Sequence, residues 1–173
     1  VRQRPVAPAR GVRGRLDTSR ALVDRPACNP EAVYGINTGF GAFANRKISA
    51  EHLDRLQLNL VRSHAAGVGE PLDAALTRRL LLLKANGLAG GYSGVRPQIV
   101  EALLALLNAD VLPVIPRVGS VGASGDLAPL AHLTLAHIGE GEARRGERAL
   151  AGADVPRAAG VEPIALTAKE GLA

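Results

Sequence analysis

The sequence predicts a mainly α-helical protein. Apolar residues recur at helical spacing in several separate segments, and no stretch alternates apolar with polar residues as a half-buried strand does. The chain has 173 residues, of which 47% are hydrophobic, which is enough for one globular domain with a core. We expect a basic, disordered tail over residues 1–15 and an ordered part over residues 16–173.

The first predicted helix covers residues 16–25 (LDTSRALVDR). Pro26 and Pro30 are expected to stop it, because proline cannot donate a backbone hydrogen bond. The next segment, YGINTGFGAFANR at residues 34–46, is too rich in glycine and asparagine for a helix.

Ser49 is a suitable N-cap for a second helix over residues 50–66. Pro71 is expected in the first turn of a third helix, where proline is tolerated, and the glycines of NGLAGGYSG should fray its end. The predicted apolar faces of these two helices are Leu53, Leu56, Leu60 and Val61, and then Leu72, Leu76, Leu80 and Leu83.

Pro97 opens a fourth predicted helix that ends near Asn108. Ser93, Gly94 and Arg96 before it are interpreted as structural, with Gly94 permitting a turn. The apolar face of this helix is formed by Ile99, Val100, Leu103, Leu106 and Leu107.

Pro113 and Pro116 enforce an extended segment over residues 110–122. A further helix is expected over 127–138, capped by Ser124 or Asp126, followed by a surface turn or hairpin over 139–158. Thr167-Ala-Lys-Glu170 is a capping box, which normally begins a helix, and only three residues follow it. We therefore expect the chain to stop inside a structural element.

The positive charge is concentrated at the start of the chain. The net charge is +5, and residues 1–25 alone carry seven arginines against two aspartates, so the remainder is neutral. We therefore expect no nucleic-acid partner. No apolar run has membrane-spanning length and no secretory leader is visible, so no membrane partner is expected. Cys28 is the only cysteine, which favours a reducing compartment, the cytoplasm.

The sequence GSVGASGDLAPLAH at residues 119–132 holds a glycine-rich loop before a helix. It lacks the Gly-Lys-Ser/Thr of a P-loop, because Gly125 is followed by Asp126, whose charge would repel a phosphate. Its glycine spacing fits neither the dinucleotide fingerprint nor the G-x-S-x-G nucleophile elbow. The histidines and Cys28 lack metal-binding spacing, so we expect no metal, and no lysine stands in a context typical of pyridoxal phosphate.

The tripeptide Ala123-Ser124-Gly125 can itself form an electrophile. The Gly125 nitrogen can attack the Ala123 carbonyl carbon, and loss of one water closes a five-membered ring. Loss of a second water from Ser124 leaves an exocyclic methylidene. Asp126 could assist the proton transfers, and the N-terminus of the following helix would add partial positive charge. A plain serine-capped turn is the alternative on spacing alone.

Several motifs together resemble the ammonia-lyase family that carries a methylidene-imidazolone prosthetic group. GSVGASGDLAPLAH resembles its signature, and YGINTGFG (34–41) resembles its catalytic tyrosine loop. LQLNLVRSHAAGVGEPL (56–72), LLLKANGLAGGYSGVRP (81–97) and LTAKEGLA (166–173) resemble segments that follow in the same order. The resemblance extends from about Leu16 to Ala173.

The resemblance implies a role for individual residues. Ala123, Ser124 and Gly125 would form the prosthetic group, which captures the substrate amine and makes it a better leaving group. Tyr34 matches the general base that removes a β-proton, and His64 matches a substrate-binding position. Asn37, Thr38 and Gly39 would shape the tyrosine loop, with Asp126 in support. A packed loop tyrosine and an ordinary helix histidine are the alternatives for Tyr34 and His64.

The resemblance also implies a substrate and an assembly. SHAAGVGEPL is similar to family members that act on histidine, so the implied reaction converts L-histidine to trans-urocanate and ammonia. Tyrosine or phenylalanine remains an alternative substrate, and a non-catalytic remnant remains an alternative function. Family members are about three times longer, form homotetramers and build each site from several subunits. We therefore expect the N-terminal portion of a lyase-like helical fold, truncated before the central bundle and inactive alone.

Overall fold

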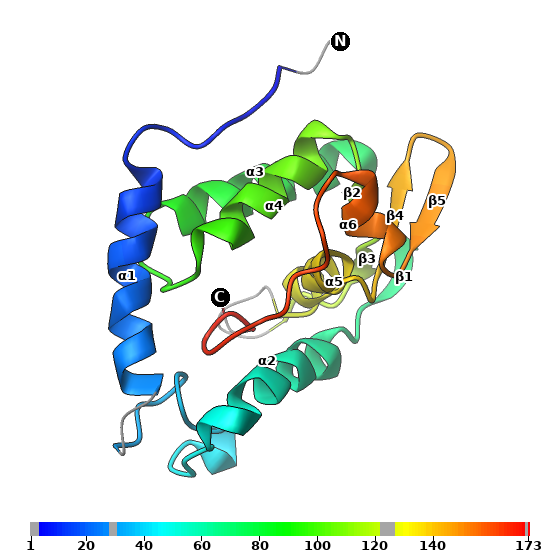
Figure 1. Ribbon diagram of the computed structural model, residues 1–173. Helices are drawn as coiled ribbons and strands as arrows, with labels where there is room; N and C mark the ends of the chain where they lie inside the picture. Colours follow the sequence, from blue (N-terminus) through cyan, green and yellow to red (C-terminus); the bar gives the residue numbers. More distant parts are fainter. Residues whose placement is uncertain (1–3, 28–30, 122–126, 172) are drawn as a thin grey trace.

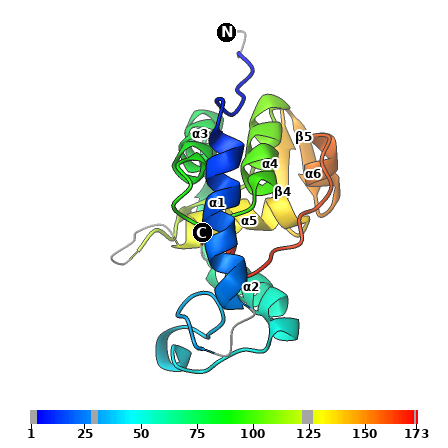
Figure 2. The same cartoon turned by 60° about the vertical axis from the view of Figure 1, so that its left-hand side comes forward.

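The computed structural model describes residues 4–27, 31–121, 127–171 and 173, and helices predominate over short strands in them. This confirms the predicted mainly α class (Figures 1 and 2). The longer helices are α1 (Val12–Ala27), α2 (Ala50–His64), α3 (Ala74–Ala89), α4 (Pro97–Asn108) and α5 (Leu127–Ile138). The shorter elements are η1 (Gly41–Phe43), α6 (Asp154–Ala158), β1 (Val68–Pro71), β2 (Leu112–Pro113), β3 (Pro116–Val118), β4 (Glu142–Arg145) and β5 (Arg148–Ala151).

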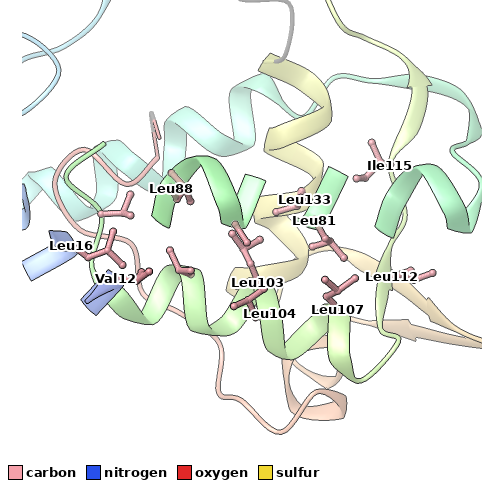
Figure 3. Close-up of a cluster of buried hydrophobic side chains, with 13 residues drawn as sticks. Val12, Leu16, Leu81, Leu88, Leu103, Leu104, Leu107, Leu112, Ile115 and Leu133 are labelled. Atoms are coloured by element: carbon pink, nitrogen blue, oxygen red, sulfur yellow. The ribbon is translucent and has the colours of Figure 1, made fainter. Parts of the chain in front are cut away.

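The main core lies between α3 and α4, with α1 across one end and α5 beneath (Figure 1). Leucines from all four helices meet there, and Leu81 is fully buried (Figure 3). Burying a leucine side chain contributes about 1.5–3 kcal/mol, so this cluster accounts for much of the packing energy. Its buried members are Val12, Leu16, Leu81, Ala85, Leu88, Val95, Val100, Leu103, Leu104, Leu107, Leu112, Ile115 and Leu133.

Two small antiparallel sheets flank the helices. One pairs β1 with β3, and the other has the order β2-β4-β5. The β4–β5 hairpin covers the ends of α4 and α5, where Ala143 and Leu150 pack against Leu106 and Ala136. The predicted extended segment is confirmed over residues 111–121 and the hairpin predicted within 139–158 is confirmed, whereas Asp110 lies in a turn and α6 was not predicted.

The first helix is longer at both ends than the helix predicted over residues 16–25. Helix α1 begins at Val12, inside the segment expected to be a disordered tail, and it continues past Pro26 to Ala27. Val12 is buried because it packs into the main core. Further upstream, the Val6 amide donates to the Asn108 Oδ1 at 2.9 Å, so residues before Val12 also contact the helices.

The start and the apolar face of α3 were also predicted wrongly. Pro71 ends strand β1 opposite Pro116, and Asp73 caps the helix by accepting a hydrogen bond from the Leu76 amide at 2.8 Å. Leu76 and Leu83 are exposed. The buried face consists of Thr77, Leu81, Ala85 and Leu88, and the helix runs unfrayed to Ala89.

The remaining helix predictions differ less. Helices α4 and α5 have the predicted bounds, whereas α2 ends at His64, two residues early. Ser49 occupies the N-cap position of α2, but its hydroxyl contacts Glu51 rather than a helix amide. The predicted cap of α5 by Ser124 or Asp126 lies outside the described residues. Among the described residues, no helix is long and apolar enough to span a membrane.

Candidate functional site

The tripeptide Ala123-Ser124-Gly125 and Asp126 lie outside the described residues, but both flanks of their segment are described. On one side, β3 is held by its pairing with β1, and Gly119 follows it. On the other side, α5 begins at Leu127. A Cβ on Gly119 would lie 2.9 Å from the Cβ of Ala128 and 3.0 Å from the Cα of Gly67, so only glycine fits where these segments meet.

A pocket of about 260 Å³ opens beside Leu127, directly after the undescribed residues. Helix α2 contributes His64, α3 contributes Lys84, and the first turns of α5 contribute Leu127 and Leu130. The final described segment closes one side with Glu170. We call this the His64 pocket; its complete lining is Leu60, Val61, His64, Lys84, Leu127, Leu130, Ala131, Thr134, Glu170, Gly171 and Ala173.

His64 stands at the last turn of α2, with a defined ring orientation. Its Nδ1 is 2.8 Å from the Leu60 carbonyl oxygen and 3.1 Å from the Ser63 Oγ. A carbonyl only accepts, so Nδ1 carries the proton in this arrangement. In the neutral ring, Nε2 is then left as a hydrogen-bond acceptor at the pocket wall. The structure thus brings His64 next to the segment that holds the tripeptide.

The tyrosine loop, residues 31–48, is a separate unit beside the start of α2 (Figure 2). Its ends are joined by backbone hydrogen bonds from Gly39 to Arg46 at 3.1 Å and from Ile48 to Asn37 at 2.8 Å. Tyr34 is 62% exposed, and its ring stands edge-on to Phe40 with 6.1 Å between centroids. Tyr34 does not line the His64 pocket, so these two predicted site residues are not brought together in the described part of the chain.

Asn37, Thr38 and Gly39 form the buried interior of the tyrosine loop. The Asn37 Oδ1 accepts from the Val33 amide at 2.7 Å, and its Nδ2 donates to the Glu31 carbonyl at 2.8 Å. The Thr38 hydroxyl donates to the Gly39 carbonyl at 2.9 Å. A Cβ on Gly39 would lie 2.7 Å from the Cβ of Phe43.

The sequence reasoning missed the role of Glu170, which anchors the wall of the His64 pocket. Its fully buried carboxylate accepts from the Arg96 Nε at 2.8 Å and Nη2 at 2.6 Å, and from the Thr167 amide at 2.9 Å. Burial alone would raise the pKa of Glu170. The hydrogen bonds from Arg96 and the two backbone amides, with the charge of Arg96, outweigh burial and hold that pKa below its ordinary value.

The bond from the Thr167 amide to Glu170 is one half of the capping box predicted at this position, although the residues that follow, 168–171, form a turn rather than a helix. Arg20 of α1 donates to the carbonyls of Gly94 and Ala168 and lies 3.8 Å from Glu170. These long-range contacts could not be predicted from local spacing. Arg96, predicted to be structural, is part of this anchor.

Two further polar groups lie close to the pocket. The Gln57 Oε1 accepts from the Gly171 amide at 2.8 Å, and a Cβ on Gly171 would lie 2.5 Å from the Gln57 carbonyl oxygen. His132, on α5, accepts at Nε2 from the Gly67 amide at 3.0 Å. Burial lowers the pKa of His132, which favours the neutral ring that such a bond needs. No cluster of metal-ligating side chains occurs in the described ranges.

The family model for aromatic amino acid lyases matches residues 1–173, and the chain belongs to that family. The histidine ammonia-lyase of Paracidovorax citrulli is 57% identical over 158 residues, which cover 91% of this chain and 31% of that enzyme. The chain thus spans about a third of the length of the curated relatives that it matches.

Solved structures agree with this family. The histidine ammonia-lyase from Trypanosoma cruzi matches with a TM-score of 0.83 and 42% identity, covering 95% of this chain and 31% of that one. The ergothionase from Treponema denticola, an ergothioneine-degrading enzyme, matches with a TM-score of 0.91 and 28% identity, covering 98% and 34%. The expected lyase-like fold is therefore confirmed for this part of the chain.

Proposed function

We propose that the whole protein carrying this chain is a histidine ammonia-lyase, which eliminates ammonia from L-histidine to give trans-urocanate. The observation that carries the proposal is the 57% identity over 158 residues to an enzyme of that name. The single cysteine, which allows no disulfide within the chain, supports a cytoplasmic location.

In this proposal Ala123, Ser124 and Gly125 form a methylidene-imidazolone group, which supplies an electrophile for the substrate amine. The described neighbours fit such a group. The His64 pocket opens beside Leu127, two residues after Gly125, and the first turns of α5 line it. The N-terminus of a helix carries partial positive charge, which stabilises negative charge on a bound substrate or on the reacting tripeptide.

His64 is proposed to bind the substrate. Its Nδ1 is occupied by the Leu60 carbonyl, so its Nε2 is the ring atom that can accept a hydrogen bond from a ligand in the pocket. The apolar residues Leu60, Leu127 and Leu130 would exclude water around the bound side chain. A single hydrogen-bond acceptor in an otherwise apolar wall can orient a small ligand.

Tyr34 is proposed to be the base that removes a β-proton. A base must reach the proton directly or through one water, and Tyr34 does not line the His64 pocket of its own copy. Its 62% exposure and the closed frame of the tyrosine loop suit a side chain that is presented to another part of the assembly. We therefore propose a homotetramer in which Tyr34 of one copy completes a site of another.

Turnover by a completed enzyme tests this proposal. The matched 158 residues of this chain would replace their counterpart in the Paracidovorax citrulli enzyme, and ammonia release would be measured with L-histidine, L-tyrosine and L-phenylalanine. We expect turnover of L-histidine to exceed that of the other two by tenfold or more. No ammonia release from any substrate would contradict the proposed function, and a preference for tyrosine would contradict the substrate.

Variants of the same chimera test the assigned roles. Ser124→Ala should abolish turnover, because alanine has no hydroxyl to lose. Tyr34→Phe should lower kcat about 10²–10⁴-fold, the usual contribution of a general base. Tyr92→Phe is the matched control, since Tyr92 is the other tyrosine of the chain and is 93% exposed. Equal kcat for both phenylalanine variants would remove Tyr34 from the mechanism.

A further inference from the structure

His132 makes a hydrogen bond that connects two motifs far apart in sequence. The amide of Gly67, which lies between α2 and β1, donates to the His132 Nε2 at 3.0 Å across 65 residues. An amide N–H only donates, so Nε2 is unprotonated and Nδ1 carries the proton in the neutral ring. Because the acceptor is a side chain on α5, this bond joins the chain after α2 to the middle of that helix.

Gly67 stands at a crossing where a Cβ would fit only if its neighbours moved by a few tenths of an ångström. A Cβ there would lie 3.1 Å from the His132 Nε2 and 3.2 Å from the Cβ of Pro116. On the neighbouring side, a Cβ on Gly119 would lie 3.0 Å from the Gly67 Cα. Three segments therefore touch at Gly67: the end of α2, strand β3 with Gly119, and helix α5.

The crossing includes both described flanks of residues 122–126. Gly119 lies three residues before this segment, and Ala128, whose Cβ would be 2.9 Å from a Cβ on Gly119, lies two residues after it. The direct contact of Gly119 with Ala128 sets the distance between the flanks, and Gly67 packs against Gly119. Gly67 is held by its bond to His132 and, from the next residue on, by the pairing of β1 with β3 at Val68 and Val118.

We propose that His132 is a positioning residue: through the Gly67 amide, it fixes the spacing of Gly119 and Ala128. This inference rests on the proposed function only in assigning a purpose to the spacing, namely cyclisation of Ala123-Ser124-Gly125. The geometric part concerns described residues alone. A histidine that only filled space on the helix would need no hydrogen-bond acceptor towards Gly67. Substitutions that remove or keep this acceptor therefore distinguish a positioning role from a packing role.

Four substitutions in the chimera, one of them a control, are compared with the parent to test the proposal. His132→Leu removes the acceptor, and His132→Gln restores one, because the amide oxygen of glutamine can stand near the place of Nε2. His137→Leu is the matched control, since His137 is buried on the same helix and its Nε2 has no hydrogen-bond partner among the described residues. Gly67→Ala perturbs the same contact from the Gly67 side, because the added Cβ would lie close to the His132 ring.

The first readout is amide hydrogen exchange, which does not depend on activity. His132→Leu should accelerate exchange at Gly67, in residues 117–118 of β3 and in residues 131–134, whose amides donate to the carbonyls of the first turn of α5, about tenfold, the equivalent of one lost hydrogen bond. His132→Gln and His137→Leu should stay within about threefold of the parent in those segments. Unchanged exchange at 117–118 and 131–134 in His132→Leu would overturn the positioning role, whether or not the chimera turns over histidine.

The second readout is the fraction of chains in which the peptide containing residues 123–125 has lost two waters. We expect this fraction, or kcat where cyclisation still completes, to fall about tenfold or more in His132→Leu and Gly67→Ala, with recovery in His132→Gln. A parent that loses no water refutes the proposed function and leaves exchange to decide the geometric part. If the parent and His132→Leu lose the two waters to the same extent, the inference alone is refuted.

Discussion

The core around α3 and α4 and the tyrosine loop are stabilised by different interactions. The core is built from buried leucines and valines whose packing is non-directional. The tyrosine loop contributes only Ile36 and Ile48 to a small apolar cluster, and its interior is the polar pair Asn37 and Thr38. It is held by directional hydrogen bonds to backbone atoms.

This difference shows why the loop can present an exposed tyrosine without a large apolar core beneath it. A hydrogen-bonded frame fixes the backbone while leaving Tyr34 at the surface. The cost is that each buried polar group must keep its partner, because an unsatisfied one destabilises the fold. Substitutions in the two regions should therefore differ in kind as well as in size.

The largest effect is expected in the core. Leu81→Ala should lower the free energy of unfolding by about 4 kcal/mol, because the fully buried side chain leaves a cavity. Leu83→Ala, two residues away on the same helix and 68% exposed, should change it by less than about 0.5 kcal/mol. Urea unfolding measures both, and similar losses would mean that the assigned buried face of α3 is wrong.

Glu170→Gln should have the next largest effect, roughly 3 kcal/mol, because it removes one charge of a buried ion pair. Glu162→Gln is the control, since the side chain of Glu162 is 81% exposed. The folded pKa of Glu170 lies below its unfolded value, so its contribution is present above the unfolded pKa and is lost as pH falls through the folded pKa. The free energy of unfolding should therefore fall less steeply towards acid pH in Glu170→Gln than in the parent. An unchanged pH dependence would contradict the lowered pKa of Glu170.

Asn37→Ala tests the frame of the tyrosine loop. It leaves the Val33 amide and the Glu31 carbonyl without their partner, which should cost about 2 kcal/mol. Hydrogen exchange should rise in residues 31–48 but not in α4. Asn59→Ala, at an exposed position of α2, is the control, and equal effects of the two substitutions would argue against a frame built on Asn37.

At neutral pH the smallest effect is expected for His137, a polar side chain that is buried among apolar ones. Burial lowers its pKa to about 4, so the folded state binds fewer protons than the unfolded state between that value and about 6.5. Its presence should therefore destabilise the fold by roughly 1 kcal/mol per pH unit as pH falls through this window. His137→Leu should remove that slope in thermal unfolding, and a retained slope would assign it to other groups.

The two regions also differ in how far the sequence predicted them. Helices α4 and α5 were predicted with the bounds that the structure has, because proline and spacing define them locally. Helix α3 was not, because Pro71 pairs with Pro116 in a sheet that no local pattern shows. The run of leucines at 80–83 also leaves the period ambiguous, so the buried face was assigned to the wrong residues.

The candidate site was predictable only in its parts. The motif predicted His64 as a substrate-binding residue, and the structure places it in one pocket with the start of α5. The burial of Glu170 and its pairing with Arg96 depend on contacts across 74 residues, which periodicity cannot reveal. The separation of Tyr34 from the His64 pocket is a property of the folded chain, and the motif that identified the tyrosine contains no information about it.

The central claim is that residues 123–125 become an electrophile, and peptide mass tests it most directly. Proteolysis of the chimera should yield a peptide spanning these residues that is lighter by two waters, whereas the same peptide from Ser124→Ala should not be. An unmodified parent peptide, in a chimera that folds and assembles, would contradict the account.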